Sequence, residues 1–599
     1  MEFYSIKQYF DNKLYLQNWD INDIECFNKI IKKQWEVIKN TFLEINDSNI
    51  IQLHNQLEFH YIKDFWFLFN MFKCFKKIDP NNIDIILNTK KNTLINILKN
   101  KETVDYYKEL IFSYFISNPL NAELIVSYYE QHSLEKKTKL YFPKGLSKEK
   151  VEYLVGKYID SEKPNMNFLS LIVNSQNKEL NLSDIIKYKA SKRLQNLSNE
   201  FFNKQKGISF GASCGISFEQ EEPIEILYNA EERNSHYSYS KRYLDNTLDY
   251  SNIFKNFADL FFYLDKQGCI SLVKHEAEIN ILERIFMRSE GEFLKSTSFV
   301  QKDMISDIQV KMYKAFLLKN KISIEDVIEY ILKNHFLDTY NIPSIYFSKP
   351  SEKTEFFEKI RTLVPEIESI LKQYQSYIDY NEIDLELLKF ASTPLFLSKI
   401  KSKLSIKYVY GSGNDFNKIS SLLFSDQVLL AYIKPYEDRY ENLYGLLSNE
   451  EVSYDMFEYF QKESIKYLID KEVLFEEEKI LKINKINSII FENLYYNDVI
   501  NFWHFPFIIR EQLLKFEENK LVVFENTLFT KEEISYFNYY LNKKEFTNGL
   551  NLRNKYSHGS NYSNTEEQEE DYNKVLKILI LILLKIDDDL KLTKPFIAK

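Results

Sequence analysis

The sequence predicts a mainly α-helical protein, and three observations carry this prediction. Of the 599 residues, 44% are hydrophobic and 28% are charged, a balance that is typical of globular domains. Glycine and proline number only twelve each, so the residues that most often interrupt helices are scarce. Apolar residues recur at helical spacing along most of the chain, whereas a strand-like alternation is confined to one short segment. For a chain of this length we expect two to four domains.

The composition also restricts the class of protein. A net charge of −9 argues against a surface that is basic throughout, as in proteins that coat nucleic acids, but it is compatible with a local RNA site. The four cysteines are far apart and form no Cys-x-x-Cys pair, so we expect free thiols rather than a zinc site or disulfides. The longest aliphatic run, Ile578–Leu584, is far shorter than the roughly 20 residues that span a membrane. We therefore expect a cytoplasmic protein that does not enter a membrane.

Residues 1–206 are expected to form a multi-helix N-terminal region with no fixed repeat period, which would serve as a sensor or scaffold. A basic helix near its end carries Lys187, Lys192 and Arg193, which are candidate RNA-binding residues. A run of positive charges is also typical of a solvated helix face, and this alternative stays open.

Residues 207–420 are expected to be a mixed region that begins with a small β insertion near 207–229. The alternating apolar residues are Ile208, Phe210, Ala212, Cys214, Ile216 and Phe218. Residues 223–228 are expected to pair with this strand as a hairpin, and helices follow. Residues 236–243 mix aromatic and basic side chains, so Lys241 and Arg242 are candidate RNA-binding residues. Chance clustering in a tyrosine-rich chain is the alternative explanation. A turn at 410–415 suggests a boundary.

Residues 421–475 are expected to be linking helices, and residues 476–599 a helical C-terminal domain. Helices are predicted at 486–496 and at 498–517, the second interrupted near Pro506, with a short extended piece at 520–524. Thr530 and Glu533 form a capping box that starts another helix. The last helix, from Tyr572 to about Asp589, is apolar almost all round and should be buried in the bundle or in a dimer interface. The acidic residues at 566–571 should lie at its N-terminus, where they stabilise it.

A short segment near the end of the chain combines residues that can cleave RNA. Asn551 is a suitable N-cap and Gly559 a suitable C-terminal glycine, so the segment between them is expected to be a short helix. It carries Arg553, Asn554 and His558, in a chain with only nine arginines and eight histidines. A histidine can take the proton of a ribose 2′-hydroxyl, and a guanidinium can stabilise the phosphorane that follows. RNA supplies its own nucleophile, so this chemistry needs no metal and no cofactor.

Arg553, Asn554 and His558 have the spacing Arg-Asn-x-x-x-His, and a long apolar helix follows them. In this the last 120 or so residues resemble the HEPN domain, an all-helical family named from higher eukaryotes and prokaryotes nucleotide-binding. The resemblance implies a compact helical bundle that forms a homodimer, with two Arg/His pairs meeting at the dimer interface. It implies catalytic roles for Arg553, Asn554 and His558. Lys555 and Tyr556 beside them are candidate RNA contacts, and the alternative role for Tyr556, in the core, stays open. It also implies a toxin or abortive-infection nuclease in antiviral (anti-phage) defence, in which the N-terminal region would sense a phage or regulatory trigger.

Two main functions therefore remain open at the level of sequence, with a nucleotide-responsive sensor that uses the glycine-rich β segment as a weaker third. The first is a metal-independent HEPN-type endoribonuclease that cleaves RNA by 2′-hydroxyl transesterification. The second is a non-catalytic helical sensor or scaffold, in which Arg553 and His558 only cap helices and form ion pairs, and the C-terminal bundle mediates dimerisation or partner binding. Two observations motivate the second function: the resemblance does not reach the first 450 or so residues, and the net charge of the whole chain is negative.

Overall fold

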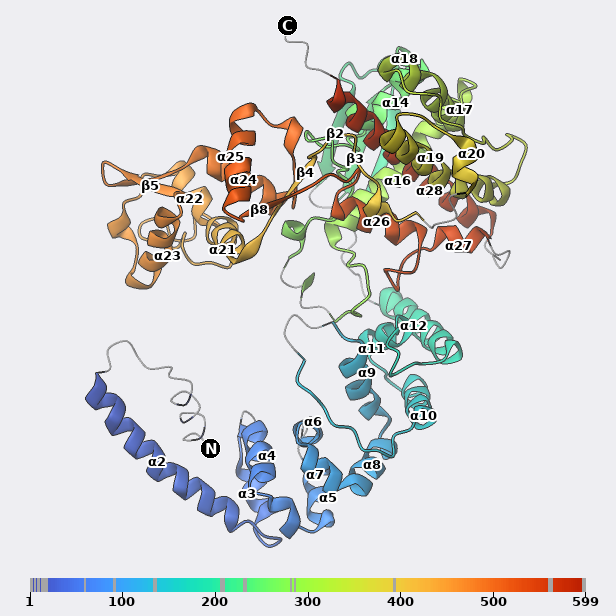
Figure 1. Cartoon of the computed structure of the whole chain (residues 1–599). Coiled ribbons are helices and arrows are strands. Elements are labelled where there is room, and N and C mark those ends of the chain that lie inside the picture. Colours follow the sequence, from blue (N-terminus) through green and yellow to red (C-terminus); the bar gives the residue numbers. More distant parts are fainter. Residues whose placement is uncertain are drawn as a thin grey trace. The chain divides into compact units, whose positions relative to one another are not determined.

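The computed structural model describes residues 4, 7, 11, 20–58, 61–89, 93–132, 137–204, 211–229, 234–280, 283–284, 287–390, 395–557 and 564–594 (Figure 1). Helices make up 61% of the structure and strands 8%, which confirms the mainly α-helical class. The chain forms two compact units. Unit 1 comprises Met1–Gly207 and Met287–Glu292, and unit 2 comprises Ile208–Phe286 and Phe293–Lys599. Each unit is described by itself.

Unit 1 consists of helices that pack on near neighbours in the sequence, for example α3 on α5 and α11 on α12. Its α-helices are α2 (Ile21–Leu43), α3 (Ile50–Gln56), α4 (Ile62–Met71), α5 (Pro80–Thr89), α6 (Thr93–Leu98), α7 (Lys101–Tyr106), α8 (Lys108–Ser117), α9 (Ala122–Glu130), α10 (Lys148–Ile159), α11 (Met166–Val173) and α12 (Asp184–Lys204). Apolar residues three or four positions apart, such as Phe65, Leu68 and Phe69 of α4, give each helix a face that joins a shared core.

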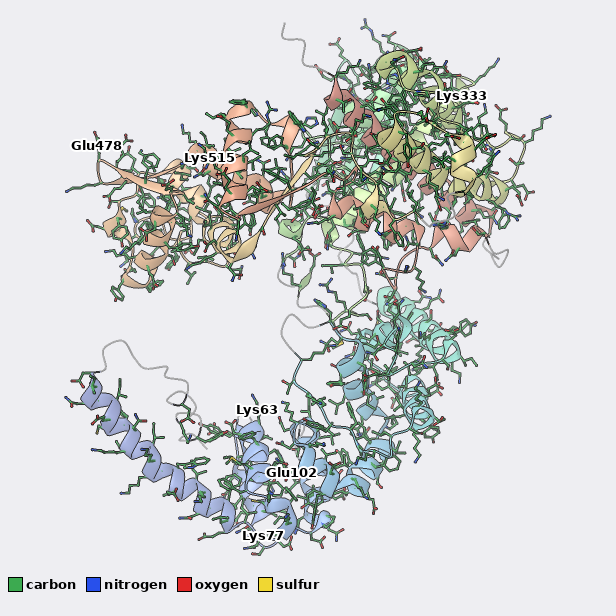
Figure 2. All side chains as sticks on the ribbon, in the orientation of Figure 1. Lys63, Lys77, Glu102, Lys333, Glu478 and Lys515 are labelled. Atoms are coloured by element: carbon green, nitrogen blue, oxygen red, sulfur yellow. The ribbon has the colours of Figure 1, made fainter. Side chains whose placement is uncertain are left out.

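Unit 2 contains a helical body built around one large hydrophobic core. Its helices are α13 (Lys241–Asp245), α14 (Tyr250–Asp259), α16 (Thr297–Lys319), α17 (Ile324–Tyr330), α18 (Phe336–Tyr340), α19 (Phe356–Tyr380), α20 (Leu385–Phe390), α26 (Lys531–Leu541), α27 (Leu552–Ser557) and α28 (Thr565–Thr593). The capping box predicted at Thr530 and Glu533 is confirmed, and α26 begins immediately after Thr530. Charged side chains lie on the outside of both units, among them the labelled Lys63, Glu102 and Lys333 in Figure 2.

The predicted β insertion is confirmed, but its pairing differs from the predicted hairpin. The strands are β1 (Gly211–Ser217), β2 (Ile224–Asn229) and β3 (Asn234–Ser240). Their order is β1-β3-β2, so β3 lies between the two strands that were expected to be neighbours, parallel to β1 and antiparallel to β2. The sequence of β3 is mostly polar, and only Tyr237 and Tyr239 on its inner face contact the core. With so few apolar residues, this segment lacks the alternation that predicts a strand, which is why the sequence indicated only an aromatic and basic cluster here. Ile208 and Phe210 lie outside the described residues.

Residues 406–525 form a lobe of unit 2 with a core of its own. A three-stranded antiparallel sheet, in the order β7-β4-β8, contains β4 (Tyr408–Gly411), β7 (Ile500–Asn501) and β8 (Val522–Glu525), and a separate hairpin contains β5 (Leu474–Glu477) and β6 (Ile480–Ile483). The helices are α21 (Gly413–Phe424), α22 (Leu443–Asn449), α23 (Tyr459–Asp470), α24 (Lys485–Tyr496) and α25 (Phe507–Glu518). The core of the lobe runs from Val409 to Val522 and spans the expected boundaries near 420 and 475.

The lobe corrects two local predictions and confirms two others. Residues 410–411, expected in a turn, are the end of β4, the central strand of the sheet. Residues 498–506, expected in a helix, contain β7 and a short 3-10 helix, and α25 begins only after Pro506. Proline has no N–H to donate and fits best where a helix starts, which explains this boundary. The predicted helix at 486–496 and the extended piece at 520–524 correspond to α24 and β8.

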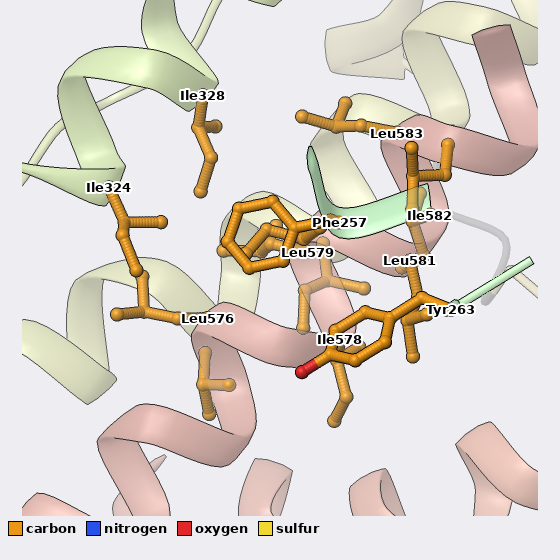
Figure 3. Close-up of a cluster of buried hydrophobic side chains, with 14 of the residues drawn as sticks. Phe257, Tyr263, Ile324, Ile328, Leu576, Ile578, Leu579, Leu581, Ile582 and Leu583 are labelled. Carbon is orange, nitrogen blue, oxygen red and sulfur yellow. The ribbon is translucent and has the colours of Figure 1, made fainter. Parts of the chain in front are cut away.

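The long helix α28 lies at the centre of the helical body (Figure 1), as its apolar sequence predicted. It contacts α14, α16, α17 and α19, and its residues from Val575 to Ile586 are buried. Figure 3 shows part of this packing, with Leu576, Leu579 and Leu583 of α28 near Phe257 and Ile328. The helix begins earlier than predicted, because Asn564 caps it through the N–H of Glu567. The acidic residues therefore occupy its first turns, as expected, where they complement the helix dipole.

Three charged side chains of α28 are fully buried and each has a partner of opposite charge. Lys577 lies 2.8 Å from Asp303 and 2.6 Å from Asp307. Lys585 lies 2.9 Å from Glu533, and Asp589 lies 2.6 Å from Lys407 at the base of the 406–525 lobe. Removing one member of such a pair leaves its partner as an unpaired charge in a poorly solvated site. These contacts therefore hold α28 in one position in the body. Among the helices of the described residues, none is both long and apolar enough to cross a bilayer.

The stability of unit 2 should depend on the ionisation of Glu532 in the first turn of α26. Burial raises the pKa of this carboxyl from 4.5 to about 7, and nearby Asp498 adds to the effect. Between pH 4.5 and about 7, Glu532 is deprotonated in the unfolded chain but still protonated in the folded protein. Folding therefore binds a proton, and the free energy of unfolding decreases as the pH rises through this range, by at most about 3 kcal/mol.

The Glu532→Gln variant cannot titrate at this position, so its free energy of unfolding should lack this part of the pH dependence. We expect urea denaturation at about pH 5 and about pH 7.5 to show a smaller difference for the variant than for the unaltered protein. Glu511→Gln is the control, because Glu511 is exposed on α25. Equal pH dependence in all three proteins would show that Glu532 is not protonated in the folded state.

Candidate active site

The helix that carries the predicted catalytic residues, α27, is amphipathic and is anchored through one face. Leu552 and Tyr556, four residues apart, are buried, whereas Arg553, Asn554 and Ser557 are exposed. The Tyr556 hydroxyl donates to Asp571 of α28 at 2.8 Å. This explains why six residues hold a helical conformation that would be unstable in isolation.

The start of α27 differs from the prediction. The helix begins directly after Asn551, but the Asn551 side chain does not cap it: its Oδ1 atom is buried and accepts no hydrogen bond from the described part of the chain. Asn551 instead has a positive φ of 56°, and its carbonyl accepts the N–H of Lys555 at 2.9 Å. Asparagine is among the few residues that adopt this left-handed conformation readily, so its role here is in the backbone turn.

Arg553 projects from α27 toward α19 and forms an ion pair there. Its guanidinium lies 2.5 Å from Glu368, and the other carboxylate oxygen of Glu368 lies 2.9 Å from Lys372. Glu368 therefore bridges two cations. A guanidinium has five N–H groups, and this contact engages one nitrogen, which leaves donors that can reach a phosphate. The Arg553 side chain remains 53% exposed, so it is accessible from solvent.

A pocket of about 610 Å³ lies beside Arg553, within the size range of small-molecule sites. Its wall is formed by α19, α20 and α27, which contributes Arg553 and the exposed Ser557, together with Tyr346. The apolar part includes Val364, Pro365, Leu385 and Leu388. The charged side chains on the wall are Arg553, Lys372, Lys389 and Glu368, so cations exceed anions here although the whole chain is acidic. A pocket of this charge attracts an anion.

The other residues of the predicted site differ from Arg553, and from one another, in their exposure and partners. Asn554 is exposed on α27. Lys555 lies 2.6 Å from Glu567 and 2.7 Å from Asp571. Burial alone would lower the pKa of Lys555, but its hydrogen bonds to Asp571 and Glu567 raise it, so it stays charged. Tyr556 is buried, so its ring faces the core. His558 lies outside the described residues; it follows Ser557, which lines the pocket.

The other candidate RNA-binding residues lie on other elements. Lys187, Lys192 and Arg193 belong to α12 in unit 1, where Arg193 donates to the carbonyls of residues 161 and 162. Lys241 and Arg242 begin α13, where Lys241 pairs with Asp245. None of these five residues lines the pocket beside Arg553.

The sequence did not point to Glu368, Lys372 or Lys389. Glu368 and Lys372 are four residues apart, a spacing that indicates only an ordinary ion pair along a helix. Glu368 is 185 residues from Arg553 in the sequence, and no local pattern connects the two segments. The described residues contain no group of three or more histidine, cysteine, aspartate or glutamate side chains arranged to hold a metal ion.

Comparison with known proteins identifies no relative of this chain. No protein-family model matches the chain, and neither the curated proteins nor the solved structures contain a match to it.

Proposed function

We propose that unit 2 is a metal-independent endoribonuclease whose substrate enters the pocket beside Arg553. The observation that carries this proposal is that Arg553, a residue of the Arg-Asn-x-x-x-His motif, lines a pocket in which cations exceed anions. Ser557 lines the same pocket and directly precedes His558 in the chain. A ribose and its two phosphates fit in a space of this size, with phosphate oxygens on Arg553 and Lys372.

The proposed reaction is a transesterification within the RNA. His558 accepts the proton of a ribose 2′-hydroxyl, and that oxygen attacks the adjacent phosphorus. Arg553 donates hydrogen bonds to the charged phosphorane, and the bond to the 5′-oxygen of the next nucleotide breaks as that oxygen takes up a proton. The products are a 2′,3′-cyclic phosphate and a 5′-hydroxyl, so neither water nor an oxidant is consumed.

The test uses the purified full-length protein and labelled RNA in excess EDTA. We expect cleavage products with 2′,3′-cyclic phosphate ends. The matched substrate is the same RNA with a single 2′-deoxy nucleotide at the main cleavage site, which should remain intact at that position because the nucleophile is missing. Cleavage at the 2′-deoxy position, or a strict requirement for Mg²⁺, would contradict the proposed chemistry.

The non-catalytic alternative rests on the ion pairs around α27. Glu368 forms an ion pair with Arg553, and Glu567 and Asp571 form ion pairs with Lys555. Such contacts are expected of side chains whose only role is to hold helices together. In that case α27 is part of a helical scaffold that mediates dimerisation or partner binding. Absence of RNA cleavage, together with protein expression that leaves cell growth unaffected, would favour this function.

The biological context is part of the proposal and rests on the resemblance described above. We propose a homodimer that acts on RNA in antiviral or toxin-type defence, with unit 1 sensing the trigger. Light scattering of the purified protein measures the assembly: a mass of one chain would contradict the dimer. Growth arrest on expression, relieved by His558→Ala, is the outcome expected for a toxin.

Replacing Glu368 by glutamine should separate the binding of RNA from its cleavage. Glu368 holds the Arg553 guanidinium at 2.5 Å, so a neutral amide would leave it less well oriented, and we expect kcat to fall about 10-fold. The pocket also loses its only negative wall charge among the described residues, so KM for RNA should fall or stay unchanged. Steady-state kinetics on a labelled oligonucleotide measures both.

Glu358→Gln is the matched control, because Glu358 is an exposed glutamate on the same helix and does not line the pocket. Its kcat and KM should equal those of the unaltered protein. A rise in kcat for Glu368→Gln would mean that Glu368 obstructs Arg553 rather than positioning it.

A further inference from the structure

The pocket beside Arg553 has an apolar part that the proposed transesterification does not use. The ring of Tyr346 lines it together with four aliphatic residues, Val364, Pro365, Leu385 and Leu388. Tyr346 is 56% exposed and Leu385 is 47% exposed, so much of this apolar surface is in contact with water. Covering such a surface with a ligand is favourable, because it removes apolar area from water. A ligand that fits this pocket therefore combines an apolar group with negative charge.

Tyr346 is held in place through its backbone. The side chain of Gln373 on α19 is only 1% exposed, and its amide accepts the N–H of Tyr346 at 2.7 Å and donates to the carbonyl of Tyr346 at 2.9 Å. One buried amide thus binds both backbone groups of Tyr346, while the ring stays at the surface. A ring that is already fixed loses little conformational freedom when a second ring stacks on it. Proteins that bind single-stranded RNA use exposed aromatic rings beside cations in this way.

The wall leaves little that could read the edge of a base by hydrogen bonds. The Gln373 amide is the one group of the described wall that offers a donor and an acceptor side by side, and it is engaged with the backbone of Tyr346 and with a serine hydroxyl of α19. Glu368 is engaged through one oxygen with Lys372 and through the other with Arg553. Adenine and guanine are told apart by paired donors and acceptors, so recognition here would depend on stacking.

We propose that this pocket seats one base of the RNA against the ring of Tyr346, and that cleavage therefore occurs preferentially beside a purine. The inference rests on the function proposed above, because it takes a nucleotide of RNA as the occupant of the pocket. Every base has an aromatic face, and the two fused rings of a purine offer a larger stacking area than the single ring of a pyrimidine. Stacking does not separate adenine from guanine, so both are accepted. The phosphate of the seated nucleotide lies on Arg553 and Lys372.

Binding of a base is tested with nucleotides that cannot be cleaved because they lack the 2′-hydroxyl. The probes are the 3′,5′-bisphosphates of deoxyadenosine, deoxyguanosine and deoxycytidine, and the same deoxyribose bisphosphate without a base. Isothermal titration of the full-length protein in EDTA should show similar affinities for the two purine probes and a lower affinity for the cytosine probe. The probe without a base should bind at least ~5-fold more weakly than the purines, the lower limit for the contribution of a stacked base.

Three results of this titration would overturn the inference. The first is equal affinity for the adenine probe and the probe without a base. The second is a difference of more than roughly 10-fold between adenine and guanine, which requires hydrogen bonds to the base edge. The third is absence of binding of every probe up to about 1 mM.

Replacing Tyr346 by alanine should weaken binding of the purine probes at least ~5-fold and leave the probe without a base unchanged, because only the stacking surface is lost. Gln373 binds backbone atoms that alanine keeps, so the melting temperature should not change. Tyr346→Phe keeps the ring and should bind like the unaltered protein. Tyr380→Ala is the matched control, because Tyr380 is an exposed tyrosine at the end of α19 that does not line the pocket. Equal weakening by Tyr380→Ala would contradict a specific role for Tyr346.

Mapping of cleavage sites separates this inference from the ribonuclease itself. On an RNA that contains every dinucleotide step, the cleaved bonds should have a purine on one constant side. Tyr346→Ala should abolish this preference and raise KM more than it lowers kcat, because stacking holds the substrate before and during the reaction. Purine binding without any cleavage would support the base site and contradict the ribonuclease. Cleavage without base preference would support the ribonuclease and contradict the seating of a base on Tyr346.

Discussion

Replacing Arg553 by alanine is expected to lower the rate of RNA cleavage at least ~100-fold, the usual loss for a group that stabilises charge in a transition state. The guanidinium of Arg553 lines the pocket and is the one planar group with several N–H donors on its described wall. His558→Ala should cause a loss of similar size, because a general acid–base group contributes roughly 10²–10⁴-fold. Arg553→Lys keeps the charge but loses the planar set of donors, so we expect intermediate activity.

The fold should survive these changes. The ion pair between Arg553 and Glu368 is partly exposed, and pairs of this kind contribute about 1 kcal/mol or less. Arg361→Ala is the matched control, because Arg361 is an exposed arginine on α19 that does not line the pocket. The test is single-turnover cleavage by the unaltered protein and these four variants, with a melting curve of each to show that it is folded. Unchanged cleavage by Arg553→Ala in a folded protein would remove Arg553 from the mechanism and leave the scaffold function as the better description.

Replacing Lys577 by methionine is expected to destabilise unit 2 by about 3–5 kcal/mol, the range measured when one partner of a buried ion pair is removed. Burial alone would lower the pKa of Lys577, but the carboxylates of Asp303 and Asp307 raise it well above its ordinary value. Without this ammonium group the two carboxylates face each other in a poorly solvated site. The midpoint of urea denaturation, followed by circular dichroism, should fall accordingly.

The same substitution at Lys591 provides the control. Lys591 is exposed in the last turn of α28 and differs from Lys577 mainly in its surroundings, so Lys591→Met should cost only a few tenths of a kcal/mol. The loss in Lys577→Met should also be smaller at acidic pH, where Asp303 and Asp307 can take up protons and lose their mutual repulsion. Equal stability of the two variants would mean that Lys577 is not the counter-ion of these carboxylates.

Local patterns predicted much of the helical structure because they depend on residues close together in the sequence. The capping box at Thr530 and the apolar run after Tyr572 each identify a helix without reference to the rest of the fold. The strands of the 406–525 lobe other than β8 were missed for the opposite reason. Tyr408–Gly411 is only four residues long and becomes a central strand by pairing with Ile500–Asn501 and Val522–Glu525, and sequence alone does not reveal such distant pairing.

The candidate site also contains residues that a local pattern predicts and residues that only distant packing brings together. Arg553 stood out because arginine is rare in this chain and because its neighbours match a motif. Glu368, Lys372 and Lys389 look like ordinary residues of amphipathic helices, and only the packing of α19 and α20 beside α27 brings them to one pocket. For Tyr556 the sequence left two roles open, contact with RNA and packing in the core, and its position on the inner face of α27 makes it part of the core.

The place of α28 at the centre of unit 2 has a consequence for protein synthesis. The ribosome makes residues 239–374 long before residues 565–593, yet apolar side chains of the two segments share one core. Unit 2 therefore cannot complete its core during translation of its first half. A nascent chain will expose that half until residues 565–593 emerge from the exit tunnel, and any activity at Arg553 arises only after that moment.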